Sequence, residues 1–251
     1  MEIAPGIHHI QNARGPKVYL LVDRDLTLID TGFPGNARPI AEYISGLGRD
    51  LSELNRILIT HSHPDHTASV AAIKAISPAQ AFAHPADTTA DSKGRPLISY
   101  LNIFGALPIP VPFLRRVYAD MLLEDGQELP ILGGLRVLHT PGHTPGSVCY
   151  YLPSERVIFL GDMVVSSRGR IGGSMPYPKT NMRLYEQSLQ RIAQLDFDIA
   201  CLSHGNVLNG NADQRIRRML DWYLRMSMWL RIARTLPPVF RLGRQTGFKE
   251  P

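Results

Sequence analysis

Four side chains that can bind a metal ion lie within six consecutive residues, and this cluster constrains the fold more than any other feature of the sequence. The stretch reads His61-Ser62-His63-Pro64-Asp65-His66, between a predicted strand (56–60) and a predicted helix (64–76). A loop at a strand end suits such ligands, because the sheet fixes the backbone while the loop aims the side chains. The chain has nine histidines, so three within six residues by chance is improbable. The cluster therefore predicts a metal site at the end of a sheet.

Three further candidate ligands follow predicted strands downstream. They are His143, in a turn rich in Gly and Pro, Asp162 after an apolar run, and His204 after another. A lone histidine at a strand end more often has a structural role. Together with the four residues of the cluster, however, these three residues give seven candidate donors, which is about the number that two metal ions need. Imidazole and carboxylate groups suit zinc, and imidazole also suits iron and other first-row metals.

The order of predicted elements indicates a mixed α and β chain in two halves. We expect strands at 18–22, 26–29, 56–60, 79–83, 135–139, 147–152, 156–160 and 199–203, and helices at 36–47, 64–76, 182–195 and 212–235. Two sheets packed face to face with helices outside would form a four-layer αββα sandwich, an α+β fold. Residues 85–128 are the least regular part and suggest a lid or a pocket wall. The apolar, proline-broken segment 97–114 within them could form a pocket wall, and packing against the C-terminal helix is the alternative.

The domain limits follow from the charge distribution. Residues 212–251 contain nine Lys and Arg against three Asp and Glu, a net charge of +6 in a chain whose total is +5. We expect a catalytic domain over 1–210 and a basic, amphipathic appendage over 211–251. Its apolar face predicts docking on the domain or on a second subunit, as in a homodimer. Contact with a membrane surface or an anionic ligand is the alternative.

Composition excludes several classes of protein. The 251 residues are 44% hydrophobic and 20% charged, which is ordinary for a globular domain. The longest apolar stretch is broken by prolines and is too irregular for a membrane span. The N-terminus has no basic and apolar leader, so we expect a cytoplasmic protein. Cys149 and Cys201 lie in apolar runs and predict buried thiols, not a disulfide framework.

This set of motifs resembles the metallo-β-lactamase superfamily over about residues 7–210. The stretch Leu28-Ile29-Asp30-Thr31-Gly32 is similar to a motif that the family carries on an early strand. The resemblance implies that Asp30 supports the metal loop from behind, whereas a plain turn residue is the alternative. It also implies a division of the ligands: His61, His63 and His143 for the first metal, Asp65, His66 and His204 for the second, and Asp162 between them.

The reaction that the resemblance implies is hydrolysis of an ester, lactone or thioester. Two ions about 3.5–4 Å apart can bind one hydroxide between them and lower the pKa of its parent water to ~7. Asp65 is the candidate catalytic residue, because its second carboxylate oxygen can shuttle a proton. We expect two divalent ions, with zinc as the preferred metal and iron or manganese as alternatives. We also expect a small-molecule substrate.

Differences between this sequence and the better-known branches of the family restrict the class of substrate that the resemblance implies. Asp162 is present and neither cysteine is a candidate ligand, which disfavours a β-lactam antibiotic and favours the glyoxalase II and lactonase branch. Val165 stands where acyl-homoserine-lactone lactonases carry tyrosine. Only 47 residues follow His204, whereas glyoxalase II has a larger C-terminal domain that holds glutathione. The family resemblance therefore does not name one substrate.

Three alternative functions stay open. A persulfide dioxygenase uses one iron on ligands that correspond to His61, His63, His143 and Asp162. An RNase Z-like phosphodiesterase would use the basic tail, although no tRNA-binding arm is evident, so nucleic acid is not expected. A binding protein without catalysis would not need all seven donors.

The loop after Asp162 is expected to border the site. Arg168 and Tyr177 are the candidate substrate contacts, together with Arg170 and Lys179, while solvated loop charges are the alternative interpretation.

Overall fold

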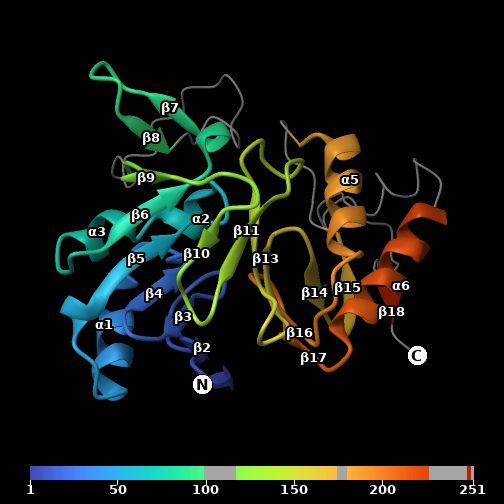
Figure 1. Ribbon diagram of the computed structural model, residues 1–251, viewed down its shortest axis with the longest axis horizontal. Helices are drawn as coiled ribbons and strands as arrows, with labels where there is room; N and C mark the ends of the chain where they lie inside the picture. Colours follow the sequence, from blue (N-terminus) through green and yellow to red (C-terminus); the bar gives the residue numbers. More distant parts are fainter. Residues whose placement is uncertain (99–116, 174–179, 226–247, 250–251) are drawn as a thin grey trace.

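The computed structural model describes residues 1–98, 117–173, 180–225 and 248–249, and these form four layers. Figure 1 shows two β-sheets packed face to face, with helices covering the outer face of each sheet. The predicted four-layer αββα sandwich is confirmed.

The first half of the described chain builds one sheet and its helices. Its elements are β1 (Glu2–Ala4), β2 (Ile7–His9), β3 (Tyr19–Val22), β4 (Leu26–Ile29), α1 (Ala37–Gly46), η1 (Leu51–Glu53), β5 (Leu54–Leu58), α2 (Pro64–Thr67), α3 (Val70–Lys74), β6 (Gln80–Ala83), η2 (Pro85–Asp87), β7 (Thr88–Ala90), β8 (Pro96–Ile98) and β9 (Met121–Leu122). The seven-stranded sheet has the order β1-β2-β3-β4-β5-β6-β9, and β7 and β8 form a separate hairpin. Strands β4, β5, β6 and β9 are parallel neighbours.

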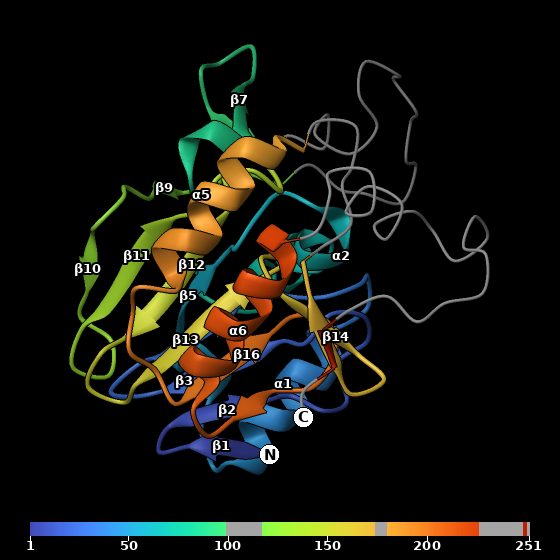
Figure 2. The same ribbon diagram turned by 90° about the vertical axis from the view of Figure 1, so that its right-hand side faces the viewer.

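The second half builds the other sheet. Its elements are β10 (Glu128–Leu129), β11 (Leu135–His139), β12 (Val148–Leu152), β13 (Val157–Gly161), β14 (Val165–Ser167), β15 (Arg170–Gly172), α5 (Met182–Ile192), β16 (Ile199–Leu202), β17 (Leu208–Asn209), α6 (Ala212–Arg225) and β18 (Phe248–Lys249). The six-stranded sheet has the order β10-β11-β12-β13-β16-β17, and β14, β15 and β18 form a small third sheet. Figure 2 shows α5 and α6 lying over the outer face of the second sheet.

Alternation along the central strands explains the layers. In β13, Ile158 and Leu160 pack with the outer helices, whereas Val157 and Phe159 face the other sheet. Strand β4 does the same, because Leu28 packs toward α1 while Ile29 faces the second sheet. Side chains of a strand point alternately to its two faces, so strands that are apolar on both faces predict burial on both sides. Three apolar layers result, one between each pair of neighbouring structural layers.

Two buried tyrosines tie the sheets together near the predicted ligands. Tyr19, on the first sheet, donates its hydroxyl to the carbonyl of Leu202 at 2.6 Å. Tyr150, on the second sheet, donates to the carbonyl of Ile59 at 2.8 Å. Each carbonyl lies two residues before a predicted metal ligand. These bonds fix the two strand ends from which the ligands emerge.

Some expected elements differ in the structure. The helix predicted over 64–76 is two short helices, α2 and α3, because the hydroxyl of Ser69 at the break bonds to the loop at Phe33 and Asn36. The helix predicted over 36–47 begins at Ala37, because the side chain of Asn36 bonds to Arg14 and Thr31 and not to the first turn of α1. Both differences come from contacts between distant segments.

The predicted C-terminal helix begins at Ala212 as expected and is described as far as Arg225. Its residues Ile216, Met219 and Tyr223 pack in the same apolar cluster as the second sheet. The remainder of the predicted helix and most of the segment 97–114 lie outside the described residues. In the parts of the chain that the structure describes, no helix has the length and apolar character to cross a membrane.

Candidate metal centre

The direction of the strands explains why distant ligands meet. Strand β11 is antiparallel to β12, and β12 is antiparallel to β13, which is parallel to β16. Strands β11, β13 and β16 therefore point the same way, and the segments carrying His143, Asp162 and His204 leave the same edge of the second sheet. The segment 61–66, which runs into α2, follows β5 of the first sheet. The segments that carry the two sets of candidate ligands come close together where Gly161 meets Thr60. Gly161 has a left-handed φ of +51°, and a Cβ there would lie 3.0 Å from Cβ of Thr60.

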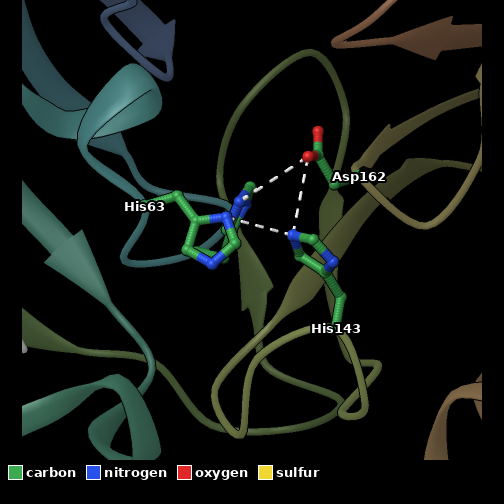
Figure 3. Close-up of side chains that lie close together, drawn as sticks. His63, His143 and Asp162 are labelled. Carbon is green, nitrogen blue, oxygen red and sulfur yellow. Dashed lines mark hydrogen bonds and ion pairs between the residues drawn. The ribbon is translucent and has the colours of Figure 1, made fainter. Parts of the chain in front are cut away.

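The first group of donors consists of His61, His63, His143 and Asp162, all buried. Nε2 of His143 lies 3.2 Å from Nδ1 of His63 and 3.5 Å from Oδ2 of Asp162. Nε2 of His61 lies 4.0 Å from the same carboxylate oxygen. Figure 3 shows the side chains of His63, His143 and Asp162 pointing toward one another from separate segments. The donor atoms of this group all lie within 4.8 Å of one another, close enough to coordinate one ion.

The second group consists of Asp65, His66 and His204. Nε2 of His204 lies 3.5 Å from Oδ2 of Asp65, and Nε2 of His66 lies 3.7 Å from the same atom. The other oxygen of Asp162, Oδ1, lies 3.4 Å from Nε2 of His66 and 3.5 Å from Nε2 of His204. The two oxygens of Asp162 therefore face different groups, so this carboxylate lies between them.

The spacing and chemistry of these donors fit first-row metal ions. Four ligands at tetrahedral angles and bond lengths of about 2.1 Å have donor atoms about 3.4 Å apart, as in zinc sites. The separations given above range from 3.2 to 4.0 Å, and all donor atoms of a group lie within 4.8 Å of one another. Nε2 of His61 and Nε2 of His66 are buried and make no hydrogen bond. Buried polar atoms are normally satisfied, so these nitrogens are suited to an ion that they would coordinate.

A buried carboxylate supports the second group from behind. Asp30 accepts hydrogen bonds from the backbone N–H of Thr60 at 2.8 Å and from its hydroxyl at 2.7 Å. Oδ2 of Asp30 also lies 2.8 Å from Nδ1 of His66, which leaves Nε2 of that ring facing the donors. Asp30 has a φ of 57°, a left-handed conformation that Asp adopts more readily than most residues. The structure thus places Asp30 where the sequence predicts a supporting residue.

Protonation differs between the two groups. Burial and the neighbouring rings lower the pKa of His61 well below its usual value, and they lower the pKa of His63 to about 3. Burial is also the main reason that the pKa of His143 is lowered. These three rings are neutral at pH 7, which is the form that binds metals.

In the second group the carboxylates dominate. Burial opposes protonation of His66, but Asp30 and Asp162 raise its pKa well above the usual value. Burial likewise opposes protonation of His204, and its contacts with Asp65 and Asp162 raise the pKa. Asp30, Asp65 and Asp162 place negative charge around these two rings, so a metal ion bound there would take the place of the protons on the rings.

Two of the four residues predicted to contact the substrate lie within the described parts of the chain. Arg168 lies at the exposed turn between β14 and β15, where it borders a cavity of about 350 Å³ together with Gly205 and Arg215. Arg170 lies on β15. Tyr177 and Lys179 lie outside the described residues. Substrate binding by these residues stays a prediction.

Sequence reasoning missed two residues that contact the ligand loops. The hydroxyl of Thr60 lies 3.0 Å from Nδ1 of His61, and its place directly before the cluster was a signal. Asp87 hydrogen-bonds to two ligand loops from a short turn, where nothing in the local sequence marks it.

The fold and the site define a class: an αββα sandwich with a candidate two-metal His/Asp centre at one edge of its sheets. A model of the metallo-beta-lactamase superfamily matches residues 12–204, and this chain belongs to that superfamily.

Relatives extend the similarity at low identity. A hydroxyacylglutathione hydrolase from Albidiferax ferrireducens is 31% identical over 138 residues, which is 53% of this chain and 42% of that protein. One from Francisella tularensis subsp. novicida is 28% identical over 205 residues, 81% of this chain and 68% of that protein. For the first curated relatives, the match spans about half of their length or less, 42% and 48%.

Solved structures agree on the fold. A metallo-beta-lactamase family protein from Thermus thermophilus has a TM-score of 0.66 at 22% identity, covering 89% of this chain and 81% of that one. A metallo-beta-lactamase from Legionella gormanii has a TM-score of 0.65 at 24% identity, covering 81% and 78%.

Proposed function

We propose that this protein is a two-metal hydrolase that cleaves an ester, lactone or thioester, with zinc as its resident metal. The observation that carries the proposal is the position of Asp162, whose two oxygens face two separate groups of donors. A carboxylate in this position can bind two ions at once, one through each oxygen. The hydroxyacylglutathione hydrolases among the relatives act, by their name, on a thioester, which supports this substrate class.

The residues available to each ion are distinct. His61, His63 and His143 would hold the first ion, Asp65, His66 and His204 the second, and Asp162 both. When bound, a pair of such ions activates water at neutral pH and polarises a carbonyl oxygen.

Exposure gives the direction of substrate approach. The side chains of His61 and His143 are each 1% exposed, whereas those of His204 and Asp65 are 41% and 29% exposed. A substrate therefore reaches the second group first. Its carbonyl would lie near Asp65 and His204, with the first group behind.

Asp65 is the proposed proton acceptor. Burial alone would raise its pKa, but the contact with His204 and the nearby His66 lower it below the usual value. The carboxylate is therefore ionised at neutral pH, as a general base must be. It lies on the open side of the site, where it can take a proton from attacking water and pass it to the leaving group.

A single-iron dioxygenase is the second candidate, because the imidazole and carboxylate donors of the first group could by themselves hold one iron ion. The complete second group favours the hydrolase. Metal analysis and oxygen consumption separate the two: a dioxygenase would contain one iron and consume oxygen with a persulfide of glutathione.

The test is a hydrolysis screen on zinc-loaded protein. The substrates are a hydroxyacyl thioester of glutathione, a five-membered lactone, an aryl ester and an aryl phosphodiester. We expect turnover of at least one of the three carbonyl substrates, lost on chelation and on Asp162→Ala. Asp213→Asn is the matched control, because Asp213 is a buried carboxylate on α6, ion-paired with Arg217 and outside both groups. Hydrolysis that survives both chelation and Asp162→Ala would exclude the proposed function.

A further inference from the structure

One buried carboxylate belongs to neither donor group and contacts the loops that carry the first. Asp87 ends the short helix η2, which follows β6 of the first sheet, and only 1% of the residue is exposed. It is not one of the candidate metal ligands. The proposed hydrolysis gives it no part.

Asp87 joins two loops that come from different sheets. Its Oδ2 accepts a hydrogen bond from the backbone N–H of Ser62 at 2.8 Å, in the loop after β5. The same oxygen accepts one from the hydroxyl of Thr144 at 2.7 Å, in the loop after β11. Its Oδ1 accepts one from the backbone N–H of Gly146 at 2.7 Å. One side chain thus receives hydrogen bonds from both loops.

The bonded residues adjoin all three histidines of the first group. Ser62 lies between His61 and His63, and Thr144 directly follows His143. A shift of either loop would therefore change the distance between His63 and His143, which is now 3.2 Å between their facing nitrogens.

The local packing is built around this carboxylate. A Cβ at position 146 would lie 2.5 Å from the backbone N of Asp87 and 2.7 Å from its Cγ, so only glycine allows the loop to approach this closely. Because the Ser62 N–H, the Thr144 hydroxyl and the Gly146 N–H all donate, a charged carboxylate satisfies them together. A carboxamide would turn an N–H toward at least one donor.

We propose that Asp87 is the positioning residue of the first metal group, as Asp30 is of the second. Asp30 contacts Thr60 and His66, whereas Asp87 contacts the loops of His61, His63 and His143. Asp30 also reaches His61 through the hydroxyl of Thr60, so the two carboxylates support the first group from separate positions. This inference rests on the proposed metal centre.

The test is stepwise zinc affinity, measured by competition with a chromogenic chelator, for wild type, Asp87→Asn and the control Asp213→Asn. Loss of a residue that orients metal ligands typically costs 10–100-fold in metal affinity. We expect one ion to be bound 10–100-fold more weakly in Asp87→Asn, and wild-type affinities in the control. Cobalt substitution gives a second readout, because its visible spectrum reports the geometry of the remaining site.

Thr144 supplies a second pair of variants. Thr144→Val removes the hydroxyl while keeping the shape, and Thr144→Ser keeps the hydroxyl. We expect Val to weaken one zinc site and Ser to restore it. A role in folding alone would lower the unfolding midpoint of the metal-free protein without changing zinc affinity. If Asp87→Asn fails to fold, the Thr144 pair decides the question.

The outcomes separate this inference from the proposed function. Wild-type protein that binds no zinc would overturn the metal centre itself. Wild-type protein with two zinc ions, and unchanged affinities in both Asp87→Asn and Thr144→Val, would overturn only the role of Asp87.

Discussion

Replacing His204 with alanine is expected to remove one metal ion and leave the other. His204 contributes to the second group alone, with Asp65, His66 and one oxygen of Asp162 as the remaining donors. Its side chain is 41% exposed, so truncation leaves no closed cavity. We therefore expect a change of at most about 0.5 kcal/mol in the unfolding free energy of the metal-free protein.

The loss of affinity follows from the number of donors. A four-ligand zinc site has an apparent binding free energy of about 10–16 kcal/mol at pH 7. Shared equally over four donors, one ligand contributes about 3 kcal/mol, which is roughly 100-fold in affinity. The first group keeps all four of its donors and is expected to keep its ion.

Metal content after dialysis against a weak chelator, measured by plasma mass spectrometry, is the assay. We expect two zinc ions per chain in wild type and one in His204→Ala. His9→Ala is the control, because His9 is a half-buried histidine outside both groups. Retention of both ions, or loss of both, in His204→Ala would refute the division of donors into two groups.

Three further predictions concern stability. Tyr19→Phe should lower the unfolding free energy by about 1–3 kcal/mol in urea titrations, because it leaves the buried carbonyl of Leu202 without the hydroxyl; a change below about 0.5 kcal/mol would contradict this. Gly161→Ala should lower the unfolding free energy by at least about 1–2 kcal/mol, because alanine disfavours the left-handed backbone at this position. It should also weaken zinc binding, because the added Cβ displaces Thr60. Wild-type stability together with wild-type zinc affinity would argue against the close approach of Gly161 to Thr60. Burial and the stacked ring of His139 lower the pKa of His84 from 6.5 to about 4. The unfolded chain therefore binds this proton more readily, and the unfolding free energy falls as pH drops from about 6.5 to 4. His84→Gln should flatten this dependence of the unfolding free energy on pH, and an unchanged slope would contradict the prediction.

The sequence allowed the donor set to be predicted because its signals are local. His61, His63 and His66 lie within six consecutive residues, and the downstream candidates each follow an apolar run. Long strands such as β4 and β11 were also predictable, with the bounds Leu26–Ile29 and Leu135–His139. Four or five residues suffice to show burial on one or both faces.

Short elements were missed for the opposite reason. Strands β9, β10 and β17 have two residues each, too few for any alternation to appear. They form because neighbouring strands offer hydrogen bonds, which a local pattern does not record. The same holds for the break between α2 and α3.

Asp87 shows this limit most clearly within the site. Its side-chain partners Thr144 and Gly146 lie 57 and 59 residues away, and Ser62 lies 25 residues before it. A carboxylate in a Pro-Ala-Asp turn is usually a surface residue. Only the packing of the two sheets turns it into a contact between ligand loops.

The two-metal centre is tested most directly by a crystal structure of zinc-loaded protein with data collected on both sides of the zinc absorption edge. We expect two anomalous peaks about 3.5–4 Å apart, one among His61, His63 and His143 and the other among Asp65, His66 and His204, with Asp162 between them. A single peak confined to the first group, or a zinc ion bound away from Asp162, would contradict the two-metal centre.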